Sequence, residues 1–345
     1  MQTLEQKEEV ILRHRVYSEL VRRGITDPIY WTRAKSELDV ICATLFQGYH
    51  LVVSDIQSWA KSQGIRMSPC RGSAGASLVC YLMDISGVDP IVHNLPFERY
   101  LNLDRVSAPD VDTDYEIGRR GEVVEYVKKR FGEKHVVKIL TLGTIKAKAA
   151  IKDAGRVLGH DFGFTNHMNS LFPSPIHGFS PTLSCVFDQT DSRYGDAKHL
   201  RAEIEANPSA REVYDLAVKL EGLIRNFGVH AAGLVVSSEP LDEIIPLRLP
   251  TGKDKEDDAD LVTGFDQPAM EPMGLIKMDI LGLENLTTIN IALDHIHRLY
   301  GKTVVVEDLP LDDAATYQMM AAGNSRGVFQ FDSPGMRNLL KRMRP

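Results

Sequence analysis

Residues 109–115 read Pro-Asp-Val-Asp-Thr-Asp-Tyr, and this stretch is the most informative about the fold. In an extended strand successive side chains point to opposite faces, so Asp110, Asp112 and Asp114 are expected to stand in one row. Two carboxylates roughly 7 Å apart repel by on the order of 2 kcal/mol at an effective dielectric near 20. A fold that gathers such a row needs cations, and hard cations with oxygen ligands are the usual partners. The row therefore predicts a metal site beside a strand.

Two other interpretations of this row compete with a metal site. A solvated edge strand would also carry several exposed aspartates. A calcium-binding loop fails on spacing, because counting from Asp110 the sixth position is Tyr115 instead of glycine and the twelfth is Gly121 instead of glutamate. The row alone leaves the metal site and the edge strand open.

A second carboxylate lies far downstream, in residues 275–283, Leu-Ile-Lys-Met-Asp-Ile-Leu-Gly-Leu. Its apolar neighbours predict a buried strand that runs into a turn at Gly282. Lys277 and Asp279 are two apart and share a face. Taken alone they are as well explained by a structural ion pair as by a functional site. Beside the first row, they become candidates for completing a metal and phosphate site.

Positions 70–77 read Cys-Arg-Gly-Ser-Ala-Gly-Ala-Ser, and all but Arg71 are small residues. The apolar run that follows at 78–83 predicts a helix. Small residues let the backbone approach a ligand, and amides with the hydroxyls of Ser73 or Ser77 suit a phosphate. A tight turn with a helix cap is the commoner fate of such a stretch. It is not a Walker loop, because no Gly-Lys-Ser/Thr follows at the required interval.

These segments, in this order, resemble the bacterial replicative DNA polymerase III alpha subunits, the C family of DNA polymerases. The resemblance extends over nearly the whole chain. Its matching stretches are Glu37-Leu38-Asp39-Val40-Ile41, Gly48-Tyr49, Cys70-Arg71-Gly72-Ser73, Phe97-Glu98-Arg99-Tyr100-Leu101-Asn102, the aspartate row, Gly143-Thr144, Ile151-Lys152-Asp153-Ala154-Gly155-Arg156-Val157-Leu158-Gly159, His230-Ala231-Ala232-Gly233, Lys277-Met278-Asp279 and Gly327-Val328-Phe329-Gln330.

The resemblance implies a set of site residues. Two aspartates of the first strand and one of the later strand would hold two magnesium ions, and these fall on Asp110, Asp112 and Asp279. Asp114 matches a carboxylate with a supporting role. Two metals can activate a primer 3′-hydroxyl and stabilise the leaving pyrophosphate. The positions implied to meet the incoming deoxynucleoside triphosphate are Arg71, Gly72, Ser73, Arg99 and Lys277, of which Lys277 is also expected to be catalytic by stabilising transition-state charge.

The resemblance also implies a fold. The expected class is α+β, with a mixed-sheet palm of the nucleotidyltransferase (polymerase beta-like) type and an inserted, mainly helical thumb. The expected boundaries are residues 1–141 for the first part of the palm, 142–230 for the thumb, 231–283 for the second part of the palm, and 284–345 for a truncated start of the fingers.

Periodicity gives the local elements. Helices are predicted at 6–23, 31–45, 55–63, 78–83, 119–131 and from 284 onward, and strands at 50–53, 110–114, 136–140, 233–236, 244–249, 262–265 and 275–279. The stretch 143–227 is predicted to be mostly helical. His230 is expected to follow a helix end at Gly228 and to have a structural role more often than a catalytic or template-binding one.

The net charge is −7, so a nucleic-acid surface cannot cover the whole molecule, and charge placement decides where one lies. Basic residues concentrate between positions 128 and 156. On the helix expected after Gly143-Thr144, side chains four apart form one stripe. Such a stripe is usually a solvated face; beside a polymerase site, contact with the phosphates of primer–template DNA is favoured. The predicted DNA-binding residues are Lys146, Lys148, Lys152 and Arg156. The acidic stretch 253–260 is expected to be an exposed hairpin loop.

Composition limits the cellular setting. No stretch of the sequence is long and apolar enough to cross a membrane, and residues 1–9 lack the apolar core of a signal peptide. The four cysteines occur singly, without zinc-site spacing. These features predict a reduced, cytoplasmic protein without membrane partners.

The sequence also departs from the family. Cys70 stands where the family usually has glycine. The family's N-terminal hydrolase-like domain, the rest of the fingers and the later domains have no counterpart here. The expected partners are therefore primer–template DNA, deoxynucleoside triphosphates, a chain supplying the remaining fingers, and other replisome subunits. The alternatives are a DNA-binding remnant without synthesis and a two-metal nucleotidyltransferase or nuclease; Arg99 and Lys277 favour triphosphate chemistry over hydrolysis.

Overall fold

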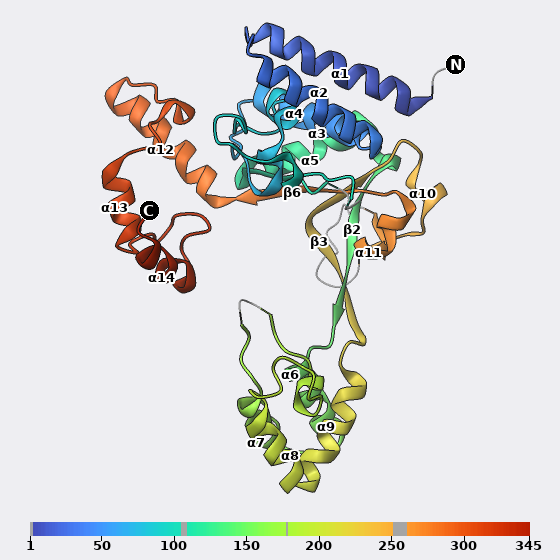
Figure 1. Cartoon of the computed structure of the whole chain (residues 1–345). Coiled ribbons are helices and arrows are strands. Elements are labelled where there is room, and N and C mark those ends of the chain that lie inside the picture. The colour runs from blue at the N-terminus through green and yellow to red at the C-terminus, as the bar shows by residue number, and fades with distance from the viewer. Residues whose placement is uncertain (1–2, 105–108, 177–178, 251–260) are drawn as a thin grey trace. The chain divides into compact units, whose positions relative to one another are not determined.

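The computed structural model describes residues 3–104, 109–176, 179–250 and 261–345, and it is a mixed α+β fold, as predicted (Figure 1). Its contacts divide the chain into two compact units. The first comprises Met1–Lys138, Ala231–Pro246 and Pro268–Pro345, and the second comprises Ile139–His230 and Leu247–Gln267.

Six strands are hydrogen-bonded in the order β1-β6-β3-β2-β5-β4. Their bounds are β1 Asp112–Glu116, β2 Val136–Thr144, β3 Ile224–Val236, β4 Leu247–Arg248, β5 Val262–Asp266 and β6 Lys277–Leu283. β1 and β6 pair in parallel, whereas β3 pairs with β6, and β4 with β5, in antiparallel fashion. The sheet is therefore mixed, and the parallel pair β1–β6 joins the strands that carry the predicted metal ligands Asp112 and Asp279.

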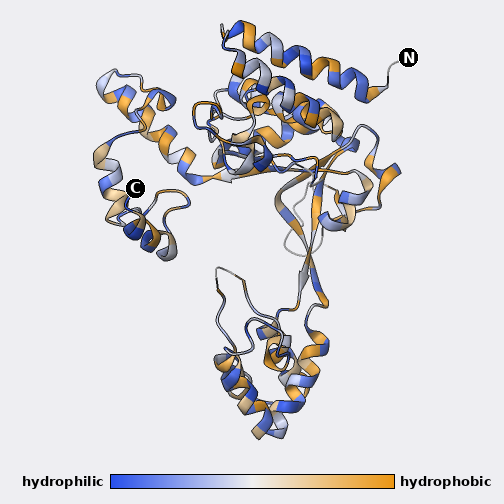
Figure 2. Ribbon diagram, in the orientation of Figure 1, coloured by the Kyte–Doolittle hydropathy of each residue, from blue (hydrophilic) through white to orange (hydrophobic). Residues whose placement is uncertain are grey.

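The first unit also contains helices. They are α1 Leu4–Arg22, α2 Pro28–Ala43, α3 Gln47–Ser62, α4 Leu78–Leu82, α5 Arg120–Phe131, α10 Leu241–Ile244, α12 Glu284–Tyr300, α13 Ala314–Ala321 and α14 Pro334–Met343, and the short α11, Gln267–Met270, begins at the unit boundary. Figure 2 shows apolar and polar residues interspersed along these helices. In α1 the fully buried Leu12, Val16 and Leu20 recur every four residues, which places them on one face.

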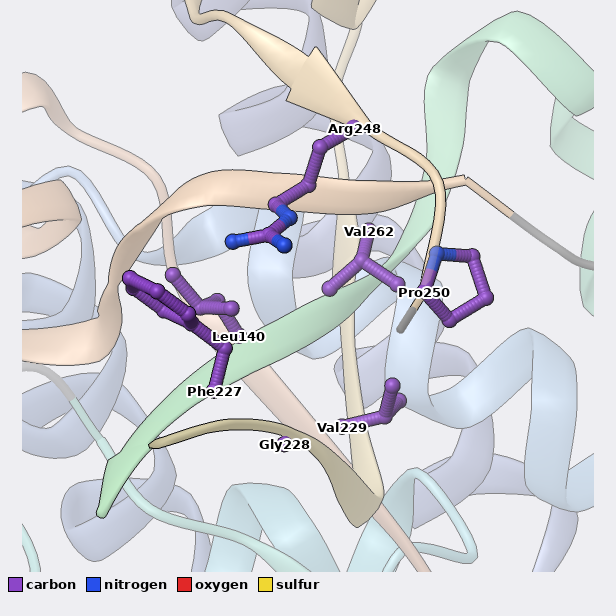
Figure 3. A pocket seen from close by; sticks show the side chains of 7 residues that line it. All are labelled: Leu140, Phe227, Gly228, Val229, Arg248, Pro250 and Val262. Carbon is purple, nitrogen blue, oxygen red and sulfur yellow. The ribbon is translucent and has the colours of Figure 1, made fainter. Parts of the chain in front are cut away.

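The second unit has its own core, built on α6 Ala147–Val157, α7 Phe162–Leu171, α8 Lys198–Ala206 and α9 Pro208–Leu220. Small residues on α6 let its neighbour approach: a Cβ added at Gly155 would lie 2.1 Å from Thr165 Cγ2 of α7. Among the strands, the Arg248 guanidinium carbon lies 4.5 Å from the centroid of the Phe227 ring, beside a cavity of about 10 Å³ (Figure 3). That volume admits about one water molecule, so the cavity is no ligand site.

The strand predicted at 50–53 is wrong. These residues lie inside α3, where His50 and Val53 are buried against the core. A short apolar run has the same appearance in a buried helix and in a buried strand, so periodicity cannot separate the two. The strand predicted at 244–249 is also largely wrong, because α10 ends at Ile244 and β4 spans only Leu247–Arg248.

Two glycines predicted to end elements lie inside strands instead. Gly282 is within β6, and Gly228 is within β3 rather than at a helix end. A Cβ at Gly282 would lie 3.0 Å from Ile117 Cγ1, and one at Gly228 would lie 2.9 Å from Thr141 Oγ1. Both glycines therefore mark close approach of a neighbouring segment, a common reason for glycine in a strand.

The other predicted elements are present, with shifted ends: the aspartate strand begins at Asp112, and β2 continues to Thr144. The stretch 253–260 lies outside the described residues. Across the part of the chain that the structure covers, no helix combines the length and apolarity needed to cross a membrane.

His50 joins α3 to the segment that follows residues 97–99. Its Nδ1 donates to the Phe46 carbonyl at 2.8 Å, and its Nε2 accepts from the Tyr100 hydroxyl at 2.8 Å. The contact in which Nε2 accepts requires the neutral ring, because protonation would turn Nε2 into a donor, whereas the donation from Nδ1 is the same in both forms. Burial lowers the pKa of His50 to about 4.

This pKa shift predicts a specific loss of stability in acid. Because the folded pKa lies below the unfolded value of 6.5, the unfolded chain takes up the proton first as the pH falls. The free energy of unfolding should decline between pH 6.5 and pH 4, by about 3 kcal/mol in total from this group. Urea denaturation across this range should show a flatter pH dependence for His50→Gln and an unchanged one for the exposed control His93→Gln. An equal slope in His50→Gln and wild type would contradict the assignment.

Candidate active site

The pairing of β1 with β6 brings the predicted metal ligands together. Asp112 and Asp279 are register partners on these parallel strands, so their side chains share one face of the sheet. Asp110 is exposed and lies just ahead of β1. One carboxylate oxygen from each of these three residues lies within 4.8 Å of the others. Among the described residues, no other group of three or more acidic, histidine or cysteine side chains is arranged so that it could hold a metal ion.

The cluster is electrostatically unfavourable by itself. At an effective dielectric near 20, two unit charges at this separation repel by about 3 kcal/mol. Burial raises the pKa of Asp112, and the Asp110 and Asp279 carboxylates raise it further, whereas Arg71 lowers it. A divalent cation would remove this repulsion, which makes the donor set suited to one.

Only one of the two carboxylate oxygens of Asp279 has a hydrogen-bond partner. Its Oδ2 accepts from Lys277 Nζ at 2.7 Å, while its buried Oδ1 has no hydrogen-bond partner. Burial disfavours the charged form of Lys277, but pairing with Asp279 outweighs burial, and the pKa of Lys277 is raised. A buried carboxylate oxygen without a donor costs free energy unless it binds something else. This oxygen therefore fits a metal ligand.

Arg71 forms ion pairs with two carboxylates, those of Asp112 and Asp114. Its Nη2 lies 3.2 Å from Asp112 Oδ1, and its Nε lies 3.0 Å from Asp114 Oδ2. The Asp114 side chain is only 3% exposed and is not one of the three clustered residues, which agrees with a supporting position. The site thus contains two cations, Arg71 and Lys277, and four carboxylates, Asp110, Asp112, Asp114 and Asp279. The excess of negative charge again favours a bound cation.

The loop that carries Arg71 is placed by pairing with β1. Met67 forms an antiparallel bridge with Tyr115, and the Ser68 amide donates to the Asp114 carbonyl at 3.0 Å. Since the two segments are antiparallel, the chain beyond Ser68 runs back toward Asp112. Gly72 has a φ of +76°, a conformation that residues with a Cβ adopt only with strain.

Four of the five predicted nucleotide-binding residues line one pocket of about 170 Å³. Its lining contains Arg71, Gly72 and Ser73 from the 3₁₀ turn region and the exposed Arg99 from residues 97–99. The fifth, Lys277, lies against Asp279. Whether these residues bind nucleotide stays a prediction, but the fold does bring the four together.

Tyr49, to which the sequence assigns no role, contacts the backbone beside the carboxylate cluster. Its hydroxyl accepts from the Val111 amide at 3.1 Å, which fixes the backbone between Asp110 and Asp112. Thr113 Oγ1 likewise donates to the Asp279 carbonyl at 2.5 Å and ties β1 to β6. No sequence signal pointed to this contact, because α3 was not predicted at this position; a buried tyrosine hydroxyl nearly always finds a partner, but its burial is known only from the structure.

The predicted DNA-binding residues all lie on the surface of the second unit, on α6 or just ahead of it. These exposed residues are Lys146, Lys148, Lys152 and Arg156. Two have neighbours: Lys152 Nζ lies 5.0 Å from the Phe162 ring centroid, and Arg156 pairs with Asp153 at 2.9 Å. The DNA contacts of α6 stay a prediction.

His230 lies within β3.

Comparison with known proteins identifies the family. Residues 3–282 match the family described as the bacterial DNA polymerase III alpha NTPase domain, and residues 285–345 match the finger domain of the same subunit. A curated relative named DNA polymerase III subunit alpha, from Mycobacterium tuberculosis, is 46% identical over 338 residues, which cover 97% of this chain and 28% of the relative. The proteins of that name from Xylella fastidiosa and Aquifex aeolicus are 40% and 37% identical, and the matches cover 93% and 92% of this chain and 27% and 28% of the relatives.

The chain therefore belongs to the bacterial DNA polymerase III alpha family. It spans about 28% of the length of the curated relatives that it matches.

Removing Arg71 should destabilise the fold. Arg71→Met leaves the Asp114 carboxylate buried without a counterion, and breaking such a pair typically costs about 3 kcal/mol or more. The double variant Arg71→Met/Asp114→Leu should recover at least half of that loss, because the buried charge is then gone. Urea denaturation measures both.

Arg13→Met serves as the control, because it breaks the more exposed contacts of Arg13 with Glu9 and Asp39 and should cost less than about 1 kcal/mol. A stability of Arg71→Met within that same range would show that Arg71 does not hold Asp114.

Proposed function

We propose that this chain is the catalytic region of a DNA-directed DNA polymerase, which adds deoxynucleotides to the 3′-hydroxyl of a primer paired to a template. The observation that carries the proposal is the cluster of Asp110, just ahead of β1, with Asp112 and Asp279 on the adjacent parallel strands β1 and β6, where Asp279 Oδ1 is buried and unpartnered. Membership of the DNA polymerase III alpha family supports it. In this proposal the sheet is a nucleotidyltransferase palm of the polymerase beta-like type.

The metal ligands in this proposal are Asp110, Asp112 and Asp279, and the cofactor is a pair of magnesium ions. Such ions, when bound, supply activation of the 3′-hydroxyl and stabilisation of the leaving pyrophosphate. The protein's own residues prepare the site. Lys277 fixes the Asp279 carboxylate through Oδ2, and Arg71 fixes Asp112 while its charge offsets part of the repulsion.

The incoming deoxynucleoside triphosphate is assigned to the pocket lined by Gly72, Ser73 and Arg99. Backbone amides and a hydroxyl of the turn suit phosphate oxygens, and the Arg99 guanidinium suits their negative charge. Arg71 lines the pocket and also contacts the metal ligand Asp112. A triphosphate bound in the pocket would therefore have one end beside the carboxylates. This pocket favours polymerase chemistry over nuclease chemistry, since hydrolysis needs no triphosphate site.

Residues 142–230, which make up most of the second unit, are assigned to the thumb. They lie in the sequence between two parts of the palm, at 1–141 and 231–283, and fingers begin at 284. The other segment of the second unit, Leu247–Gln267, falls in the second part of the palm in this assignment. The exposed basic residues on α6 would contact backbone phosphates of primer–template DNA without reading sequence. The proposed partners are a chain that supplies the rest of the fingers and other subunits of the replisome, because this chain matches only about 28% of each relative. The proposed location is the cytoplasm.

Primer extension tests the proposal. The wild-type chain, with magnesium, four deoxynucleoside triphosphates and a primed DNA template, should extend the primer and release pyrophosphate. Asp279→Asn keeps the side-chain shape but removes a metal-binding charge, so the rate should fall at least about 1000-fold, equal to about 4 kcal/mol. Asp242→Asn, an exposed carboxylate on α10, is the control and should extend normally.

The other outcomes discriminate between the alternatives. Near-normal extension by Asp279→Asn would overturn the site assignment. Release of mononucleotides without pyrophosphate would support a nuclease. Absence of both activities, with primer–template DNA still bound, would support either a DNA-binding remnant or a split enzyme whose synthesis needs a partner chain that supplies the fingers.

A further inference from the structure

A buried ion pair in α2 lies behind the proposed triphosphate pocket. Arg33 Nε donates to Glu37 Oε1 at 2.6 Å, one helical turn apart. The Glu37 side chain is 0% exposed and that of Arg33 is 24% exposed. Neither residue has a part in the chemistry proposed above.

Glu37 holds the end of the turn that forms one wall of the pocket. Its two carboxylate oxygens accept from the Leu78 and Val79 amides, each at 3.0 Å, and from the Ser77 hydroxyl at 2.8 Å. These donors directly follow the 3₁₀ turn Gly72–Ala76, which contains Ser73. The carboxylate thus fixes where this turn stops and α4 begins.

Arg33 reaches the opposite wall as well. Its Nη2 donates to the Ala76 carbonyl at 3.1 Å and to the Leu95 carbonyl at 2.9 Å. Ala76 ends the turn, and Leu95 leads into residues 97–99, where Arg99 lies. Both carbonyl-bearing residues line the same pocket as Ser73 and Arg99. A single guanidinium therefore joins the two segments that carry the pocket's polar side chains.

Stability alone is a weak explanation for this arrangement. Taking a carboxylate and a guanidinium out of water is expensive, and apolar residues of similar volume often stabilise such a position equally well. What a fully hydrogen-bonded pair adds is defined geometry, because every donor and acceptor specifies one position for its partner.

We propose that Arg33 and Glu37 are positioning residues for triphosphate binding, which set the separation between the wall that carries Gly72 and Ser73 and the wall that carries Arg99. This inference rests on the proposed function of the pocket. The two residues touch neither substrate nor metal ligand; they act through the backbone of both walls.

The test uses Arg33→Lys in the whole chain. A lysine keeps the charge opposite Glu37, but one ammonium replaces the fork that reaches both carbonyls. Hydrogen exchange should accelerate at least about fivefold at the amides of Ser77 and Tyr100, which bond to Ala74 and Phe97 within the two walls. In primer extension the KM for deoxynucleoside triphosphate should rise about tenfold while kcat stays within about twofold, as expected for lost ground-state binding.

The matched control is Lys35→Ala on the same helix. Lys35 pairs with Asp39 at the same spacing and at 3.0 Å, but both side chains are exposed. It should change neither exchange in the walls nor the KM. If circular dichroism shows that Arg33→Lys does not fold, Glu37→Gln, which removes the charge and keeps the shape, takes its place with the same expected results.

The outcomes separate this inference from the proposed function. Unchanged exchange in the walls, or faster exchange with an unchanged KM, would overturn the positioning role while the polymerase assignment stands. Absence of extension and of triphosphate binding in the wild-type chain would overturn the proposed function, and the positioning role with it, even if Arg33→Lys loosened both walls.

Discussion

The parallel pairing of β1 with β6 is the constraint on which the rest of the site depends. It places Asp112 directly opposite Asp279 and so brings like charges together from distant parts of the sequence. The hydrogen bond from Thr113 to the Asp279 carbonyl reinforces this pairing. Repulsion of about 3 kcal/mol between neighbouring carboxylates works against it. The fold therefore has to supply positive charge beside the cluster, and Arg71 and Lys277 do so.

Two layers of residues support the site, one by charge and one by fixing the backbone. Arg71 and Lys277 each bind a carboxylate of the cluster directly. Behind them, the fully buried Glu37 fixes the turn that follows Arg71, and Tyr49 of α3 fixes the backbone at Val111. The helices α2 and α3 thus serve the site through hydrogen bonds to backbone rather than by presenting side chains to a ligand. This organisation explains why charged and polar residues are buried so close to the cluster.

The sequence predicted the local elements well where periodicity was long and bounded, as in α1, α2 and α5. It failed at 50–53, where a short apolar run is ambiguous, and at Gly228 and Gly282, where glycine marks close packing rather than a turn. The aspartate row and Asp279 were found from their spacing and from the family resemblance. The hydrogen bonds of Arg33, Glu37 and Tyr49 could not be found, because they join segments that are distant in sequence and depend on packing.

Binding of Mn²⁺, followed by electron paramagnetic resonance of the free ion, tests most directly whether the strand pairing builds a metal site. The wild-type chain should bind Mn²⁺ in competition with Mg²⁺. Asp112→Asn should weaken that binding at least about tenfold, because it removes a ligand charge from the centre of the cluster. Asp242→Asn should leave it unchanged. Equal Mn²⁺ affinity in wild type and Asp112→Asn would contradict the account, since the clustered carboxylates would then have no metal to justify their repulsion.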